Sequence, residues 1–485
     1  MDAANSDEKS ITVKKSENFS EWYTQVITKS EFVDYSSVSG MIVFRPDAYF
    51  AWEAIKRAVD ERLRADGVQN VYFPMLIPEK LLDREKEHIE GFSAEVAWVT
   101  QGGKSQLEER LAIRPTSEAI MYESYSKWVR SWRDLPIRQN QWNSVIRWEF
   151  KHPTPLLRNR EFLWNEGHSV FATEEEAIAE RDRILGIYSE VLRDYLAIPG
   201  IVGRKTDTEK FAGGQASYSI EHLMPDGKAI QGPDHHQDGQ NFARAFDIKF
   251  LNRNEEYSYP FQNTYAITTR ELGVIVLLHG DDKGLVMPPK LSRIQVVIVP
   301  IYSRQNREAV LDYCMKVRDS LSDKFRIYLD DSDEYSPGWK YNEYELKGVP
   351  LRIEIGAREQ KGESLTVVRR DTSEKSIIPI ANAGNRVSEL MDSIHNNLYR
   401  RALEYLKSHI TKTDDYAELK TIIGGKGGFV QSPWCGSAEC EAKIKDETGA
   451  KATNMPLDAQ GDVQGKKCIY CGKEARHIVN FARSY

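Results

Sequence analysis

The pattern of apolar and polar positions changes along the chain and predicts two kinds of structure. Residues 46–67 carry apolar side chains at helical spacing and lead into an apolar run at 68–73 that ends at a proline, which predicts a long helix followed by a strand. A second amphipathic helix is predicted over 173–196. Residues 228–250 and 257–278 alternate strand and helix signals, so we expect mixed α and β structure in this part.

Beyond residue 290 the pattern becomes that of an alternating α/β domain. The run from Ile294 to Ile301 is almost continuously β-branched, as in a parallel strand that is buried on both faces. Helix, strand, helix and strand patterns follow at 306–321, 325–329, 339–347 and 351–355. Strands and helices that alternate in this way predict a compact α/β domain.

The length of the chain predicts several domains. At 485 residues it exceeds what one core supports, so roughly two to four domains are expected. We predict a flexible N-terminal tail at 1–18 and domains at 19–290, 291–390 and 391–485. The tail is polar and mixed in charge and lacks the apolar segment of a signal peptide.

Composition narrows the function classes. The chain is 40% hydrophobic and 29% charged, and its formal net charge of −7 argues against a general polyanion binder. Any nucleic acid would have to meet local basic patches. No apolar run approaches the roughly 18 residues that a membrane helix needs, so no membrane association is expected. The scarcity of cysteine is typical of a reduced, cytoplasmic protein.

Four of the cysteines form two short pairs near the C-terminus. Cys435 and Cys440 make one pair, and Cys468 and Cys471 make the other. Two such pairs can supply the four thiolates of a tetrahedral zinc site, which would be structural because it leaves no open position. Thiol pairs without metal are the alternative.

The segment from Arg147 to His168 concentrates charged and aromatic side chains within about one hairpin's length. An Arg-x-Glu start, a connector with Pro153 and Pro155, and a second apolar and charged run predict strand, loop and strand. Such a hairpin can direct Arg147 and Arg158 toward a polyphosphate, since guanidinium groups stay charged and grip paired oxyanions. A solvent-exposed charged hairpin is the alternative.

A further helix is predicted to begin near Thr268, which can cap it, and carries Arg270 in its first turn. A cation is unfavourable beside the positive end of the helix dipole. A phosphate bound at this helix terminus would explain the arginine, and a capped surface helix is the alternative.

Taken together, these motifs resemble the class II aminoacyl-tRNA synthetases. Residues 46–73 are similar to motif 1 of that class, Arg147–His168 to motif 2, and Thr268–Val274 to motif 3. Residues 92–99 and the Arg-Pro-Thr-Ser-Glu element at 114–118 resemble the prolyl-tRNA synthetases, in the archaeal/eukaryotic-type branch with a C-terminal zinc-binding domain. The resemblance covers about residues 20–485.

The resemblance implies a fold and a function. It implies an α+β catalytic domain at 19–290, built on an antiparallel sheet flanked by helices, an α/β anticodon-binding domain at 291–390, and a small α+β zinc-binding domain at 391–485. It also implies a homodimer through motif 1. The implied activity joins L-proline to ATP as prolyl-adenylate and then transfers the prolyl group to tRNA(Pro). Roughly 100 residues separate motif 2 from motif 3, too few for the editing domain that bacterial-type prolyl enzymes insert there.

The resemblance also assigns site residues. ATP and its magnesium would be bound by the two motifs together with Gln231, which is expected beside the metal; the ATP set is Arg147, Glu149, Arg158, Asn159, Gln231, Thr268 and Arg270. Proline would be bound by Phe92, Glu95, Thr116, Glu118, Arg147, Trp164, His168 and His236. The anticodon would be read by stacking on a splayed base and by contacts to base edges, from Trp339, Glu343 and Arg352.

These residue types suit the chemistry. The substrate carboxylate is already a charged nucleophile, so its attack on the α-phosphate of ATP requires positioning and charge stabilisation rather than a base. Arg147 is the candidate to bridge that carboxylate and the phosphate. The secondary ammonium of proline has only two N–H donors, which Glu118 and Thr116 can satisfy. A helix cap with a first-turn carboxylate is the alternative for this pair.

One segment departs from the family. Between Gln231-Gly232 and the Gly-Gln-Asn-Phe run at 239–242 the family usually has a small residue and then Thr-Ser-His, whereas this chain has Pro233-Asp234-His235-His236. Asp234 is therefore predicted to place a carboxylate beside the pocket, which leaves metal use and substrate fit open at this end. A His-rich turn without a ligand is the alternative for Asp234 and His235.

Two other functions fit the sequence. The chain could be a class II synthetase for another amino acid, such as threonine, serine or glycine, or an inactive paralogue that binds tRNA. The full set of phosphate-binding residues argues against the second of these.

Overall fold

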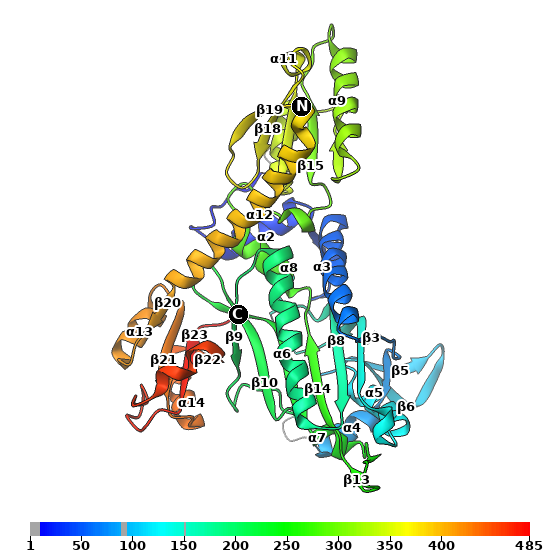
Figure 1. Cartoon of the computed structure of the whole chain (residues 1–485), viewed down its shortest axis with the longest axis vertical. Helices are drawn as coiled ribbons and strands as arrows, with labels where there is room; N and C mark the ends of the chain where they lie inside the picture. Colours follow the sequence, from blue (N-terminus) through cyan, green and yellow to red (C-terminus); the bar gives the residue numbers. More distant parts are fainter. Residues whose placement is uncertain (1–9, 89–94, 150–151) are drawn as a thin grey trace.

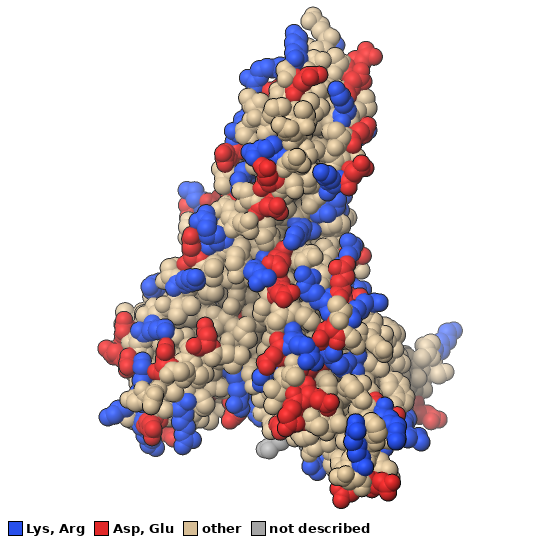
Figure 2. Space-filling model, viewed as in Figure 1, with Lys and Arg blue, Asp and Glu red and all other residues tan. Residues whose placement is uncertain are grey.

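The computed structural model describes residues 10–88, 95–149 and 152–485, which form three connected parts, with the C-terminal part beside the first and the α/β part at the other end of the molecule (Figure 1). Residues 1–9 of the predicted tail lie outside the described residues. Within the described ranges, no helix is both long and apolar enough to cross a membrane. On the face drawn in Figure 2, basic and acidic side chains are interspersed over all three parts.

The first part is built on an antiparallel sheet, as the resemblance implied. Its strands follow the order β9, β10, β11, β14, β8 and β7, each antiparallel to its neighbour, and β3 joins β7 in parallel at the edge. They span Ile201–Arg204 (β9), Ala216–Leu223 (β10), Ala229–Gly239 (β11), Phe261–Ala266 (β14), Glu161–Phe171 (β8), Ile137–Ile146 (β7) and Gln69–Asn70 (β3). The strand predicted at 68–73 is thus shorter, because only two of its residues pair with the sheet edge.

Four helices pack around this sheet. They are α3 (Pro46–Ala65), α5 (Glu118–Trp128), α6 (Glu174–Val191) and α8 (Arg270–His279). The helix predicted at 173–196 starts in a capping box, in which Thr173 accepts from the Glu176 amide and the Glu176 carboxylate reaches back. It covers β11 and β14 and ends in a π-helical turn at Leu192–Leu196, where Ala197 adopts a left-handed conformation (φ 57°).

Smaller elements complete this part. They are α2 (Phe19–Lys29), the hairpin β1 (Val33–Tyr35) and β2 (Ile42–Phe44), α4 (Glu79–His88), the sheet β4 (Leu76–Pro78), β6 (Ser105–Ile113) and β5 (Trp98–Gly102), α7 (Asn241–Ala245), and the hairpin β12 (Phe250–Leu251) and β13 (Tyr257–Ser258).

The predicted α/β domain is confirmed as a separate five-stranded sheet. The buried β15 (Val296–Pro300) lies between β16 (Ile327–Leu329) and β17 (Leu351–Ile355), and both pairings are parallel, as the β-branched run predicted. Two antiparallel strands, β18 (Ser364–Arg369) and β19 (Lys375–Pro379), extend the sheet. Its helices are α9 (Arg307–Leu321), α10 (Pro337–Leu346) and α11 (Ala357–Lys361).

A long helix, α12 (Ala383–Ser408), leads from this domain to the third part and spans the domain boundary predicted at 390/391. The third part contains β20 (Ile410–Lys412), α13 (Tyr416–Gly424), β21 (Phe429–Trp434), α14 (Ala438–Thr448), β22 (Lys451–Pro456) and β23 (His477–Ala482). β22 pairs with β9 of the first part. The strands of the third part therefore extend the antiparallel sheet, which has eleven strands in all among the described residues. The buried Lys205 reinforces this junction by donating to Glu221 and to the Thr453 carbonyl, both at 2.7 Å.

Candidate active site

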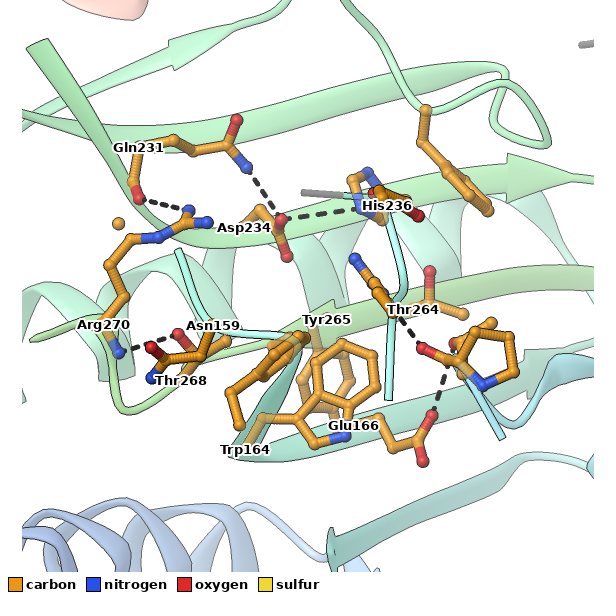
Figure 3. Close-up of a pocket in the computed structure, with 18 of the residues that line it drawn as sticks. Asn159, Trp164, Glu166, Gln231, Asp234, His236, Thr264, Tyr265, Thr268 and Arg270 are labelled. Carbon is orange, nitrogen blue, oxygen red and sulfur yellow. Dashed lines mark hydrogen bonds and ion pairs between the residues drawn. The ribbon is translucent and has the colours of Figure 1, made fainter. Parts of the chain in front are cut away.

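A cavity of about 500 Å³ opens over the centre of the antiparallel sheet. Figure 3 shows side chains that converge on it from β8, β11, β14 and the start of α8. Its lining contains most of the residues predicted for ATP and proline, namely Thr116, Glu118, Arg147, Glu149, Arg158, Asn159, Trp164, His168, Gln231, His236, Thr268 and Arg270. The predicted ATP and proline residues thus share one cavity, although they come from segments far apart in the sequence.

Arg147 lines this cavity. It follows the last residue of β7, so the hairpin strand ends just before the predicted arginine. Its Nε donates to the Pro115 carbonyl at 3.0 Å, and its guanidinium lies 5.2 Å from the Trp164 ring and 5.4 Å from the Phe162 ring. Aromatic faces hold a cation without neutralising it, so Arg147 keeps its charge for a ligand.

Arg270 begins α8, is half-buried and lines the cavity. It donates to the Gln231 carbonyl at 3.0 Å and to the Leu157 carbonyl at 3.2 Å (Figure 3). Burial lowers the pKa of Arg270, with Glu271 and Asp234 opposing that effect. Thr268 accepts from the Arg270 amide at 3.1 Å, while Thr269 occupies the cap position. A half-buried cation at the positive end of a helix is a strong anion site.

Two further predicted residues, Arg158 and Asn159, also line the cavity. Arg158 donates to the main-chain oxygen of Tyr485 at 2.6 Å, so the C-terminus of the chain meets the cavity. Asn159 is buried, and its amide group has no hydrogen-bond partner among the described residues. An unpaired buried amide is costly, which favours a ligand contact here.

The opposite end of the cavity carries the carboxylates. Thr116 donates to Glu118. Glu166, which the sequence analysis did not assign, is buried and accepts from the Ser117 hydroxyl at 2.6 Å, from Gln141 at 2.8 Å and from Asn143 at 2.6 Å. Burial acts to raise the pKa of Glu166, but hydrogen bonds from His168, Ser117 and Asn143 outweigh it and hold that pKa at about 2.

His168 and Trp164 stand beside this carboxylate. The His168 ring is fully buried between Tyr122 at 3.2 Å and Glu166 at 3.3 Å. Trp164 donates its indole N–H to Asn143 at 2.7 Å. Both rings are fixed by hydrogen bonds, so they form a rigid wall.

His236 faces them from β11 (Figure 3). Its Nδ1 lies 2.7 Å from the Ser217 hydroxyl, which already accepts from the Phe211 amide at 3.0 Å. The other ring nitrogen, Nε2, lies 3.7 Å from the Asp234 carboxylate. Burial lowers the pKa of His236. Phe211 lies against this ring with centroids 4.8 Å apart and lines the cavity; nothing in its sequence neighbourhood signalled that role.

Asp234 and His235 belong to the segment in which the sequence departs from the family, and their side chains point to opposite faces of the sheet. Asp234 lines the cavity, accepts from Gln231 at 2.9 Å and lies 3.7 Å from His236. His235 points away and stacks on Tyr265 with centroids 6.0 Å apart. It is fully buried, and burial lowers its pKa well below the usual range. The predicted carboxylate beside the pocket is thus in place, whereas His235 does not reach the cavity.

Two predicted proline-binding residues are not among those that line the described cavity, for different reasons. Phe92 lies outside the described residues. Glu95 is exposed, does not line the cavity, and contributes only its carbonyl, which accepts from the Trp148 amide at 2.9 Å. Glu95 thus lies beside Trp148, at the start of the loop that follows β7.

The predicted anticodon residues lie together on α10 and β17. Trp339 stacks on Tyr335 with centroids 3.7 Å apart. Glu343 pairs with Lys347 at 2.8 Å. Arg352 pairs with Glu345 and Glu354, each at 3.1 Å. To bind RNA, the Trp339–Tyr335 pair would have to accept a base beside it. Arg352 would have to give up its contact with Glu345 or Glu354 in order to contact that base.

The four C-terminal cysteines converge. Their sulfur atoms all lie within 4.8 Å of one another, and Cys435 is 3.7 Å from both Cys440 and Cys471. Four sulfurs about 2.3 Å from a tetrahedral zinc ion would be about 3.8 Å apart. The thiols are unbridged, so the group fits a zinc ion.

Three family models match successive parts of the chain. They are the tRNA synthetase class II core domain (G, H, P, S and T) at 98–279, the anticodon binding domain at 295–390, and the prolyl-tRNA synthetase C-terminal domain at 416–485. With the antiparallel sheet and the three arginines that line its cavity, these matches define a class II aminoacyl-tRNA synthetase.

Comparisons with full-length proteins show to which family of this class the chain belongs. The chain is 48% identical to a proline–tRNA ligase of Alkaliphilus oremlandii over 96% of both chains, and 46% identical to proline–tRNA ligase 2 of Bacillus cereus over 97% and 98%. The crystal structure of prolyl-tRNA synthetase from Cryptosporidium parvum, complexed with halofuginone and AMPPNP, matches with a TM-score of 0.93 and 41% identity, over 99% of this chain and 100% of that one. The chain belongs to the prolyl-tRNA synthetase family.

Proposed function

We propose that this chain activates L-proline with ATP and transfers it to tRNA(Pro), and that the cavity over the sheet is the site of both steps. Arg147 carries the proposal, because it alone among the predicted residues was assigned to both substrates, and it lines the cavity near enough for its charge to act on both His236 and Arg270.

In the first step Arg147 holds the proline carboxylate against the α-phosphate. Arg158 and Arg270 bind the remaining phosphates and stabilise the charge that develops on phosphorus, and Asn159 supplies its unpaired amide. The carboxylate oxygen attacks, pyrophosphate leaves, and no protein base is required.

Recognition of proline falls to the other end. Thr116 and Glu118 accept the two N–H groups of the secondary ammonium, and Glu166 holds Ser117 and His168 in place behind them. The ring then packs against Trp164, His168 and His236. A wall of fixed rings suits a flat, apolar ring.

Magnesium would be held by ATP together with Gln231 and Glu149, both of which line the phosphate end. It would neutralise charge on the phosphates. Zinc would be held by the four cysteines, where the all-thiolate set makes it structural.

Partners and location complete the proposal. The α10 and β17 residues Trp339, Glu343 and Arg352 would read the anticodon, a second copy would pair through the α3 region, and the free thiols support a cytoplasmic location. We also propose the domain bounds 19–290, 291–390 and 391–485, and the family matches at 98–279, 295–390 and 416–485 each fall within one of these ranges.

The test is Arg147→Ala. Loss of the bridging cation should reduce proline-dependent ATP–pyrophosphate exchange by at least about a hundredfold, while tRNA affinity in a filter-binding assay stays within about threefold. Arg160→Ala is the control, since Arg160 is in the same hairpin but contacts the Ser39 carbonyl and does not line the cavity. An equal loss of exchange and tRNA binding would mean that Arg147 is structural.

A further inference from the structure

A second cavity, of about 210 Å³, adjoins the catalytic cavity and takes no part in the steps above. The two cavities share four lining residues, which are Leu157, Arg158, Gln231 and Arg270. The other side of the second cavity is lined by residues that include Lys205, Glu209, Glu221, Lys451, Ser484 and Tyr485. This side cavity therefore connects the proposed phosphate-binding residues with the junction between the first and third parts of the molecule.

Cationic side chains are in excess around the side cavity. Its charged lining consists of Arg158, Lys205, Arg270 and Lys451, against the carboxylates of Glu209 and Glu221 and the main-chain oxygen of Tyr485 that accepts from Arg158. Lys205 is buried and committed to its own partners, since it donates to Glu221 and to the Thr453 carbonyl, both at 2.7 Å. The attraction for an anion therefore comes from Arg158, Arg270 and Lys451.

Lys451 marks the outer end of the side cavity. It begins β22, and its side chain is 40% exposed, whereas that of Lys205 is 9% exposed. Its Nζ lies 4.0 Å from a Glu209 carboxylate oxygen, which is longer than a hydrogen bond. An exposed ion pair of this kind contributes little to stability, so the ammonium can turn from Glu209 to an anion at small cost.

We propose that the side cavity binds the pyrophosphate formed with the adenylate and is the path by which it leaves the enzyme. The proposal rests on the proposed function, in which Arg158 and Arg270 already hold the phosphates that become pyrophosphate. Both arginines belong to the wall that the two cavities share. Lys451 then takes up the anion on the far side, as lysine does at other phosphate sites, while the adenylate stays in the catalytic cavity.

The size of the side cavity fits this ligand. Pockets for drug-sized ligands begin at roughly 300 Å³, so about 210 Å³ suits a small anion rather than a second nucleotide. A series of cations along such a path also attracts a multiply charged anion from solvent. In the reverse reaction pyrophosphate must enter by the path through which it leaves, because the two directions share one mechanism.

The first test changes the outer cation. In proline-dependent ATP–pyrophosphate exchange on the full-length protein, Lys451→Ala should raise KM for pyrophosphate at least about fivefold, because a charge-assisted hydrogen bond is lost. KM for ATP and for proline should stay within about twofold of the parent values. Lys451→Arg should restore most of the loss, since it keeps the charge.

Lys412→Ala is the matched control for this test. Lys412 forms an exposed pair with Asp462 at 3.0 Å in the same part of the molecule and lines neither cavity, so all three KM values should remain those of the parent. An unchanged KM for pyrophosphate in folded Lys451→Ala, or an equal rise in KM for ATP, would overturn the proposal and leave the proposed function standing. No proline-dependent exchange by the parent would overturn both.

The second test narrows the path without changing its charge. Ser484→Trp should slow pyrophosphate release at least about fivefold, measured by stopped flow with pyrophosphatase and a fluorescent phosphate sensor. Adenylate formation in the first turnover, measured by quenched flow, should stay within about twofold of the parent. Ser408→Trp is the control, because Ser408 is exposed and lines neither cavity. Release at the parent rate from folded Ser484→Trp, or an equal slowing of both steps, would contradict the proposal.

Discussion

At the scale of single residues, the site is held by buried hydrogen bonds that the ligands themselves do not make. Ser217 holds the His236 ring through Nδ1, and Glu166 accepts hydrogen bonds from Ser117, Gln141 and Asn143 beside the cavity. Such groups fix the side chains that contact substrate and cost no reorganisation during the reaction.

Glu166 should therefore stabilise the fold in a pH-dependent way. Its folded-state pKa of about 2 lies below the ordinary glutamate value, so its contribution is complete above about pH 5 and is lost as the pH falls toward 2. Glu166→Gln should lower the free energy of unfolding by about 2–3 kcal/mol at pH 7. The loss should shrink steadily in urea denaturation between pH 5 and pH 3.

A matched control for this prediction is Glu123→Gln. Glu123 forms an exposed pair with Lys127 at 3.5 Å on α5, so its loss should cost less than about 0.5 kcal/mol. A Glu166→Gln deficit that stays constant across the pH range would show that the carboxylate charge is not what stabilises this end.

At the scale of elements, sequence patterns predicted the helices and the buried parallel strand well, because those signals are local. Residues 46–67, 173–196 and 294–301 correspond to α3, α6 and β15. The resemblance to motifs 2 and 3 predicted that Arg147 and Arg270 belong to one site, and both residues line the cavity. Phe211 escaped prediction, since it lies in a loop whose place at the cavity is not revealed by periodicity.

The pairing of β22 with β9 also escaped prediction, because it joins residues some 250 positions apart. This pairing links the cysteine cluster to the catalytic sheet and carries Tyr485 to Arg158. Order in the C-terminal domain should therefore influence the phosphate end of the cavity.

Removal of the metal tests this link. The purified chain should hold about one zinc ion by atomic emission, because four thiolates are the expected ligand set. Chelation or Cys435→Ser should lower Tm by several degrees and raise KM for ATP several-fold, as Arg158 loses its contact. Cys314→Ala, a change to the buried cysteine of α9, should leave the metal content unaltered. A metal-free protein with the same Tm and KM would contradict the link.

At the scale of the whole molecule, three parts with separate roles meet over one cavity. The residues between β8 and α8 are occupied by α6, α7 and β9–β14 of the catalytic part, as the short separation of the two motifs predicted. Within this part of the chain, discrimination against smaller amino acids then falls to the pocket, and a pocket separates substrates that differ by few methylenes only weakly.

Amino-acid-dependent ATP–pyrophosphate exchange with each of the twenty amino acids tests the central claim most directly. The account predicts the highest kcat/KM with proline, weak but detectable exchange with alanine at high enzyme concentration, and none with threonine, serine or glycine above background. An absence of exchange with proline, or a clear preference for another amino acid, would contradict it.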